Sequence, residues 1–361
     1  MNSQEFFTDS PVHPGEHLRE TIELLGISQT KLANRIGLSR KVINEIISGK
    51  APITPQTSIL LERVIRTPAH VWNNLQRNYD LNIVYILEQK KLEKDSHLLS
   101  NFPISKMVKY GWIQKRNNKS EKVKALYNFF GIGSLNNFEH SLAIKFRRSS
   151  RINISKESVF AWLRKGELEV QSITTKSYNK NELRRCLQKL RSLTKTDPKI
   201  FQPEIIKLCS EVGVAVAFIP ELPKACVNGA TFWVNNKKAA VLLSLRYKTN
   251  DQLWFSFFHE IGHILLHNKR ESFVELDDDN LSEDEQRKER DADEFAENIL
   301  IPPRKWDVFK YNMPFSRQKV LSFAENLDIA PGIIVGRLQR EGFLSFTHLN
   351  GLKVKYEWVL N

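Results

Sequence analysis

Apolar positions recur at helical spacing along the first half of the chain. Between residues 13 and 80 the periods are short and are interrupted by Gly and Pro, and residues 81–175 continue with further helical patterns. Three apolar, β-branched runs follow at 213–219, 229–234 and 239–245, which is typical of strands. The pattern predicts a mostly helical α+β protein whose one small sheet leads into another apolar helix.

The chain divides into three parts where this pattern changes. We expect an N-terminal all-α domain over residues 9–80, a basic helical connector over 81–180 and a C-terminal domain over 181–361. Residues 101–200 hold 22 Lys and Arg against 7 Asp and Glu, whereas residues 251–300 hold 5 against 15. The basic middle indicates either an acidic partner or a solvated lysine-rich surface, and the charge alone leaves both open.

The sequence lacks the features of membrane and secreted proteins. No run of 18 apolar residues occurs, so we expect no membrane span. The first residues do not have the basic start and apolar core of a secretory signal. Cys186, Cys209 and Cys226 are widely spaced and form no CxxC pair, which favours reduced thiols in a cytoplasmic protein.

Residues 28–50, SQTKLANRIGLSRKVINEIISGK, show the spacing of a helix-turn-helix. Ser28 and Ser39 stand where the N-caps of two helices are expected. Gly37 stands in the turn, where a positive φ is cheap only for glycine, and Ala33 is small because the second helix crosses over it. Apolar side chains fall where the two helices would share a core, at Leu32, Val42, Ile43 and Ile46.

Polar side chains on and beside the second of these helices suit DNA. Arg and Asn fit base edges, and Lys fits phosphates. The residues predicted to contact DNA are Gln29, Ser39, Arg40, Lys41, Asn44 and Ser48. Two ordinary packed helices would share part of this pattern, and residues 1–80 are almost neutral. A dimer would still collect enough phosphate contacts through local basic residues.

The wider stretch over residues 13–81, which begins HPGEHLRETIELLG and ends NNLQRNYDL, resembles the Xre-type antitoxins of the HigA family. The resemblance implies a five-helix DNA-binding domain that dimerises on an operator. It also implies a nearby toxin, which such proteins sometimes neutralise.

A second candidate site is HEIGHILLH, which begins at His259. His259 and His263 are one turn apart on the same helix face, so their imidazoles can bind one zinc ion. Glu260 lies beside that face, where it can act as a general base. Gly262 weakens the helix and indicates a close approach of backbone or ligand. His267 suits the helix end better than a shared zinc ion.

A catalytic zinc ion needs a third protein ligand, and the best candidates lie in ERDADEFAENILIPP, residues 289–303. Apolar residues at helical spacing predict a second helix there, with Asp291 and Asp293 near its start. An acidic first turn also favours the helix dipole without any metal. Composition therefore leaves the third ligand open.

FHEIGHILLH and ERDADEFAENILIPP, with GATFW before them, are similar to the ImmA/IrrE family of zinc metallopeptidases. The resemblance implies a zincin-like fold of the gluzincin type, with one Zn²⁺ per chain. Matched to the family pattern, the third ligand falls on Asp291, beside His259 and His263. Asp is one methylene shorter than the family's Glu, so Glu289 and Glu294 stay as substitutes.

The same resemblance implies an edge strand that pairs with the main chain of the substrate. Gly229, Ala230 and Thr231 are the residues of this chain that match it. Main-chain pairing of this kind gives affinity with little demand on sequence. A structural strand with a buried Trp233 is the alternative.

These observations predict a cytoplasmic, antitoxin-like DNA-binding regulator that carries a zinc-dependent endopeptidase. Its partners would be operator DNA, a second copy of the chain, and a protein substrate, which is a repressor, a toxin–antitoxin partner or the chain itself. Two alternatives remain. One is a non-proteolytic HigA-like repressor whose zinc domain senses or binds a toxin, and the other is a scaffold whose basic middle binds an acidic partner. We also expect the acidic stretch 275–285 to pack on the basic middle and hold the site closed.

Overall fold

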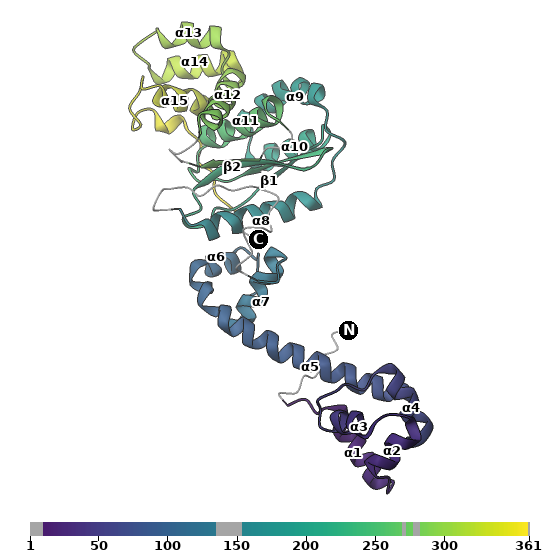
Figure 1. Ribbon diagram of the computed structural model, residues 1–361. Helices are drawn as coiled ribbons and strands as arrows, with labels where there is room; N and C mark the ends of the chain where they lie inside the picture. The colour runs from purple at the N-terminus through teal and green to yellow at the C-terminus, as the bar shows by residue number, and fades with distance from the viewer. Residues whose placement is uncertain (1–9, 135–153, 269–271, 277–281, 360–361) are drawn as a thin grey trace. The chain divides into compact units, whose positions relative to one another are not determined.

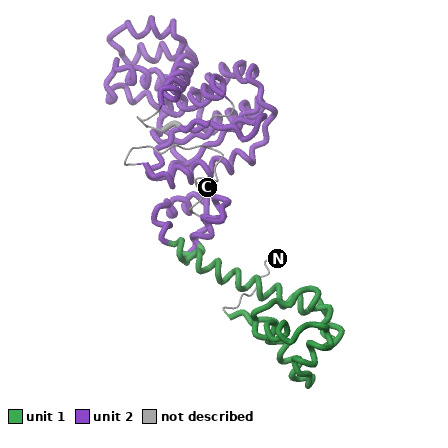
Figure 2. Tube along the Cα trace, in the orientation of Figure 1, with its two compact units in different colours: residues 1–96, 118–121 green, residues 97–117, 122–361 purple. Residues whose placement is uncertain are grey.

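The computed structural model describes residues 10–134, 154–268, 272–276 and 282–359 (Figure 1). The chain forms two compact units, residues 1–96 with 118–121 and residues 97–117 with 122–361 (Figure 2). Across the described ranges, no helix is long and apolar enough to cross a membrane. Part of the acidic stretch predicted to hold the site closed, residues 277–281, lies outside them.

The N-terminal unit is built from helices. These are α1 (Pro14–Leu24), α2 (Gln29–Ile36), α3 (Arg40–Ile47), α4 (Pro55–Ile65) and the 27-residue α5 (Ala69–Asp95). Their apolar sides meet in one core, which includes Leu18, Leu32, Ala33, Ile43, Ile46, Leu61 and Trp72. The predicted shared core of the second and third helices is therefore present.

The predicted N-cap residues stand at the starts of α2 and α3. The hydroxyls of Ser28 and Ser39 accept hydrogen bonds from the backbone N–H groups of Lys31 and Val42, at 3.2 and 3.3 Å. Gly37 ends α2 with φ +73°, a conformation that is strained for residues with a Cβ. The tight turn between α2 and α3 follows from these capping residues.

The second unit joins more helices to one sheet. The helices are α6 (Ile104–Lys109), α7 (Lys119–Phe130), α8 (Lys156–Ser172), α9 (Lys180–Ser192), α10 (Pro198–Ser210), α11 (Asn250–Leu266), α12 (Glu283–Leu300), α13 (Pro303–Lys310), α14 (Arg317–Leu327) and α15 (Pro331–Arg340). Short 3₁₀ turns are η1 (Ser96–Asn101), η3 (Leu193–Lys195) and η4 (Asn350–Leu352). The strands are β1 (Val214–Phe218), β2 (Val227–Asn235), β3 (Lys238–Leu243) and β4 (Phe273–Leu276).

The sheet has the strand order β1-β3-β2-β4. β1 runs parallel to β3, whereas β2 is antiparallel to both of its neighbours. The first three strands agree with the three apolar runs in the sequence. This mostly helical α+β architecture confirms the predicted fold class.

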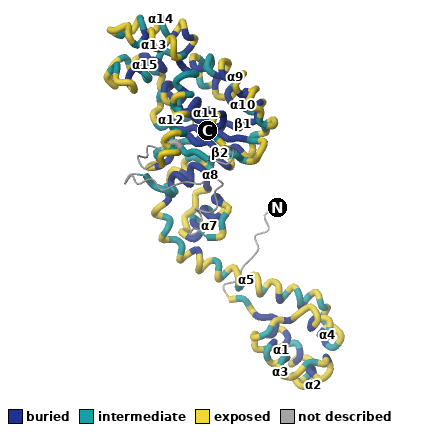
Figure 3. Tube along the Cα trace, turned by 45° about the horizontal axis from the view of Figure 1, so that its top comes forward, coloured by how far each residue is buried: buried dark blue, intermediate teal, exposed yellow. Residues whose placement is uncertain are grey.

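Helices cover both faces of the sheet, which explains why β1 and all of β3 after Lys238 are apolar rather than alternating. On one face Leu242 of β3 meets α8, where a Cβ on Gly166 would lie only 2.1 Å from the Leu242 side chain. On the other face Val241 and Leu243 join the core that includes Trp254 and Phe257 of α11. Figure 3 shows buried residues concentrated in β1, β2 and α11.

Candidate functional site

Helix α11 carries the three residues of the HExxH motif in the interior of the second unit. Its apolar residues face the sheet on one side and neighbouring helices on the other, so it is buried nearly all round. His259 and His263 are each 2% exposed and Glu260 is fully buried. Three polar side chains this deep are costly to bury unless they are partnered.

Helix α12 lies directly against α11. Its N-terminus is fixed by a capping box in which Ser282 and Glu285 bond each other's backbone N–H groups. A Cβ on Gly262 would lie 3.2 Å from the Cα of Ala292, so the glycine allows the two helices to approach closely. The close approach expected at Gly262 is therefore made by the backbone of α12.

This contact brings one carboxylate of α12 to the two imidazoles. Glu289 Oε2 lies 3.1 Å from His259 Nε2 and 3.6 Å from His263 Nε2, and the two Nε2 atoms are 2.9 Å apart. The three candidate ligand atoms lie within 4.8 Å of one another. Two imidazole nitrogens and one carboxylate oxygen are a donor set that suits zinc and leaves a fourth position open.

The protonation states of these groups also suit a metal. Burial lowers the pKa of His263 to about 4, so its imidazole is neutral near pH 7. Burial alone would raise the pKa of Glu289, but hydrogen bonds from His259 and His263 outweigh it and hold that pKa at about 2. Neutral imidazole and ionised carboxylate are the forms that bind a metal.

The other nitrogen of each imidazole has a partner. His259 Nδ1 lies 2.8 Å from Asp293 Oδ1, and His263 Nδ1 lies 3.1 Å from His267 Nδ1. Carboxylates in this position fix the ring orientation and the tautomer of a metal-binding histidine. Asp293 thus orients His259 from the same helix that supplies Glu289.

Glu260 is held beside these histidines by β2. Thr231 Oγ1 donates a hydrogen bond to Glu260 Oε2 at 2.5 Å. A Cβ on Gly229 would lie 2.5 Å from Glu260 Oε1 and 2.8 Å from its Cγ. The carboxylate therefore occupies space that exists only because residue 229 has no side chain.

In the N-terminal unit, most of the residues predicted to contact DNA lie on one accessible surface. Arg40, Lys41, Asn44 and Ser48 are exposed on or next to α3, whereas Gln29 at the start of α2 is half-buried. Ser39 is exposed as well, and its hydroxyl caps α3. The described geometry leaves the polar side of α3 open to solvent.

Models of known protein families match parts of both units. The helix-turn-helix family model matches residues 18–72, and the model of the IrrE N-terminal-like domain matches residues 209–314. Virulence-associated protein I of Dichelobacter nodosus is 38% identical over 73 residues, which are 20% of this chain and 68% of that protein. The chain belongs to the helix-turn-helix family. Its second unit carries the IrrE-like domain, so both predicted resemblances are confirmed.

Two solved structures are similar to the N-terminal part of the chain. The antitoxin HigA of Pseudomonas aeruginosa, solved with the higBA promoter, is 34% identical and covers 24% of this chain and 95% of its own, with a TM-score of 0.23. An addiction module antidote protein of the HigA family from Coxiella burnetii is 32% identical and covers 24% and 94%, with a TM-score of 0.22.

In the IrrE-like domain, the structure differs from the expectation that Asp291 is the third ligand. Asp291 lies 3.9 Å from His267 Nε2 and contacts neither His259 nor His263. Glu289 and Asp293 are four residues apart, so both lie on the face of α12 toward α11. Asp291 lies between them in the sequence and is turned away from the two imidazoles. Glu294, the other substitute, is exposed and contacts Asn298 instead.

The position of β2 also differs from the expectation of an edge strand. Ala230 pairs with Val274 and Thr231 with Phe273, so β4 covers the side of β2 that was expected to bind substrate. The Phe273 ring stacks on His263 with centroids 4.0 Å apart and an interplanar angle of 14°. β4 could not be predicted from the sequence, because four residues beside a charged stretch give too short a pattern to identify a strand.

Proposed function

We propose that this chain is a DNA-binding regulator whose IrrE-like domain is a zinc-dependent endopeptidase. The observation that carries the proposal is the buried group of His259, His263 and Glu289 with Glu260 fixed beside it. One Zn²⁺ per chain would be held by these two imidazoles and this carboxylate. A zinc ion so bound supplies Lewis acidity and lowers the pKa of water.

Glu260 would act as the general base and acid of peptide hydrolysis. Its carboxylate would accept the proton of the attacking water and later deliver it to the leaving amine. The hydrogen bond from Thr231 and the space at Gly229 support this role, because they fix the carboxylate without placing a cation against it. Asp293 would accept a hydrogen bond from His259 Nδ1, which would leave the Nε2 lone pair of His259 available to the zinc ion.

The protein substrate would be a repressor, a toxin–antitoxin partner or the chain's own helix-turn-helix domain. The test is to incubate the purified, zinc-loaded chain with the products of its neighbouring genes and to identify fragments by mass spectrometry. We expect defined cuts that disappear when a chelator removes the metal and return when zinc is added back. Cutting that is equally fast in the chelated protein would contradict the proposal.

A second function is favoured by one specific observation. Because β4 pairs with β2 in the structure, the main-chain edge expected for a substrate is covered. A non-proteolytic HigA-like repressor, whose metal domain binds or senses a toxin, would need no free edge there. If zinc binds but no candidate protein is cut under any condition, this second function replaces the first.

For the helix-turn-helix domain we propose operator binding as a homodimer with half-sites about one helical turn apart. Arg40 and Asn44 would contact base edges, so Arg40→Ala and Asn44→Ala should each cost about 1–3 kcal/mol of specific binding. Arg63 is also exposed, on α4, and Arg63→Ala serves as the matched control. Gel shifts with the operator and with scrambled DNA measure the effect. Equal binding by all three variants would place the recognition surface elsewhere.

A further inference from the structure

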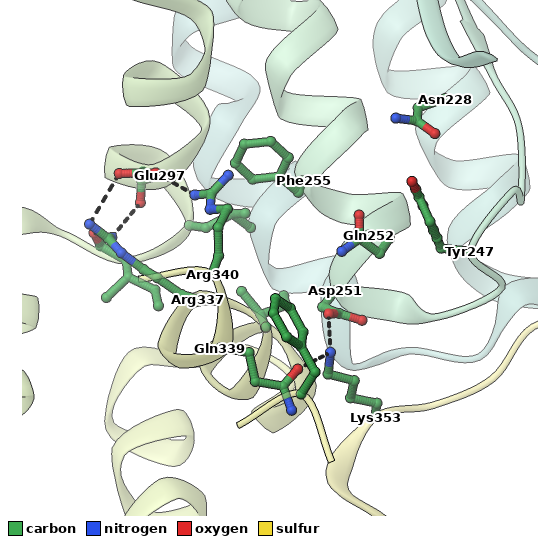
Figure 4. A pocket seen from close by; sticks show the side chains of 15 residues that line it. Asn228, Tyr247, Asp251, Gln252, Phe255, Glu297, Arg337, Gln339, Arg340 and Lys353 are labelled. Atoms are coloured by element: carbon green, nitrogen blue, oxygen red, sulfur yellow. Dashed lines mark hydrogen bonds and ion pairs between the residues drawn. The ribbon is translucent and has the colours of Figure 1, made fainter. Parts of the chain in front are cut away.

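A cavity of about 390 Å³ opens in the IrrE-like unit between α11, α12, α15 and the C-terminal segment (Figure 4). Its size falls within the range of about 300–1,000 Å³ that is usual for ligand pockets. None of the three proposed metal ligands lines it, so it is a separate feature of this unit.

The cavity continues the helix faces that carry the metal-binding residues. Phe255 lies one turn before His259 on the same face of α11, and the two rings have centroids 6.2 Å apart. On α12, Glu297 follows Asp293 by one turn, and Asp293 contacts His259. A third wall residue, Asn228, immediately precedes Gly229, the residue against Glu260. A peptide bound at the metal centre therefore has this cavity beside it.

About half of the wall is apolar, and the other half is polar or charged. Phe255, Leu300, Ile301, Ile333 and Phe346 line the cavity, and Tyr247 adds a further aromatic ring. This apolar part of the wall favours a bulky apolar side chain, because burying it removes apolar area from water at roughly 25 cal/mol per Å².

Each charged side chain of the cavity contacts one of opposite charge, and Arg337 has a further partner outside the wall. Lys353 Nζ lies 2.6 Å from Asp251 Oδ2. Glu297 contacts both Arg337 and Arg340, and Arg337 also contacts Glu341 at 2.7 Å. The wall itself holds one more positive than negative side chain, and Glu341, which lies outside the wall, balances it through Arg337. An entering carboxylate or ammonium would find no unbalanced opposite charge and would lose its hydration.

Arg340 adds a hydrogen-bond donor to the wall. The Arg340 guanidinium stacks on the Phe255 ring, 4.0 Å from its centroid, and the two lie side by side in Figure 4. The Arg340 side chain remains 39% exposed, so it can still donate to a peptide carbonyl at the mouth of the cavity.

We propose that this cavity is the specificity pocket of the peptidase and takes a large uncharged side chain, aromatic or long aliphatic, from the protein substrate next to the bond that is cut. The inference rests on the proposed function and names its substrate class. Ile333, Gly336, Arg337, Gln339, Arg340, Phe346 and Lys353 all follow residue 314, where the match to the IrrE N-terminal-like domain ends. The C-terminal segment of this chain thus determines much of the substrate choice.

The test uses the full-length, zinc-loaded chain with Glu260→Gln, which would bind substrates without cutting them. Fluorescent peptides that are identical except for Phe, Leu, Glu or Lys at one central position are titrated by anisotropy. We expect the Phe and Leu peptides to bind at least about tenfold tighter than the Glu and Lys peptides, which is about 1.4 kcal/mol.

Gln252→Trp adds a bulky ring at an exposed position on the cavity wall and should abolish this difference in affinity. Gln318→Trp, at an exposed position on α14 outside the cavity, is the matched control and should keep it. Equal binding of all four peptides, or equal selectivity in both Trp variants, would contradict the proposed role of this cavity. If the peptides bind selectively but the protein with Glu260 intact cuts none of them, the proposed peptidase activity is contradicted and the proposed pocket is supported.

Discussion

Replacing Glu260 with Gln is expected to lower the rate of peptide hydrolysis by about 10²–10⁴-fold. The amide keeps the shape of the side chain but cannot accept the proton of the attacking water. Because Glu260 is not one of the three clustered ligand residues, the zinc content of the variant should stay at that of the unaltered chain. The rate is measured by mass spectrometry on the substrate found by the cleavage screen, and the metal by elemental analysis.

Glu294→Gln is the matched control for this experiment, because Glu294 is exposed on α12 and contacts Asn298. It should leave both the rate and the zinc content unchanged. Hydrolysis by the Glu260→Gln variant at the unaltered rate would show that another group takes the proton, and it would remove the proposed role of the HExxH glutamate.

Glu289→Ala is expected to weaken zinc binding more than about 100-fold, because partners that only orient a ligand already contribute 10–100-fold. Asp293→Ala should fall within that 10–100-fold range, since Asp293 orients His259 without facing the Nε2 pair. Asp291→Ala should have little effect, because Asp291 lies beside His267. Competition with a chromophoric chelator gives the three affinities.

The order of these three affinities decides the third ligand. If Asp291→Ala proves the most damaging change, α12 must be rotated relative to α11 in the zinc-loaded protein, and the assignment from the family pattern holds instead. A result in which Glu289→Ala binds zinc as the unaltered chain does would remove Glu289 from the site.

Much of both domains could be predicted because local patterns determined them. Ser28, Gly37 and Ser39 determine the helix ends of the helix-turn-helix through capping and positive φ, which are properties of single residues. The apolar character of α11 likewise required burial of His259 and His263, whatever surrounds them.

Features that depend on how two helices face each other could not be predicted. The choice between Glu289 and Asp291 depends on the rotation of α12 about its axis, which is determined by the contact of Ala292 with Gly262. The cavity is less predictable still, because Phe255 and Arg340 are far apart in sequence and meet only when α15 packs on α11. No short-range sequence pattern predicts their contact.

The missing side chain at Gly229 has a genetic consequence. Every single-base change that replaces glycine by another residue introduces a Cβ, which here would enter the volume of the Glu260 carboxylate. Because the contacts include the Cγ as well as the carboxylate, the whole Glu260 side chain must turn to another rotamer to make room. Ordinary point mutation at this one codon can therefore produce alleles that keep the metal and the DNA-binding domain but misplace the base.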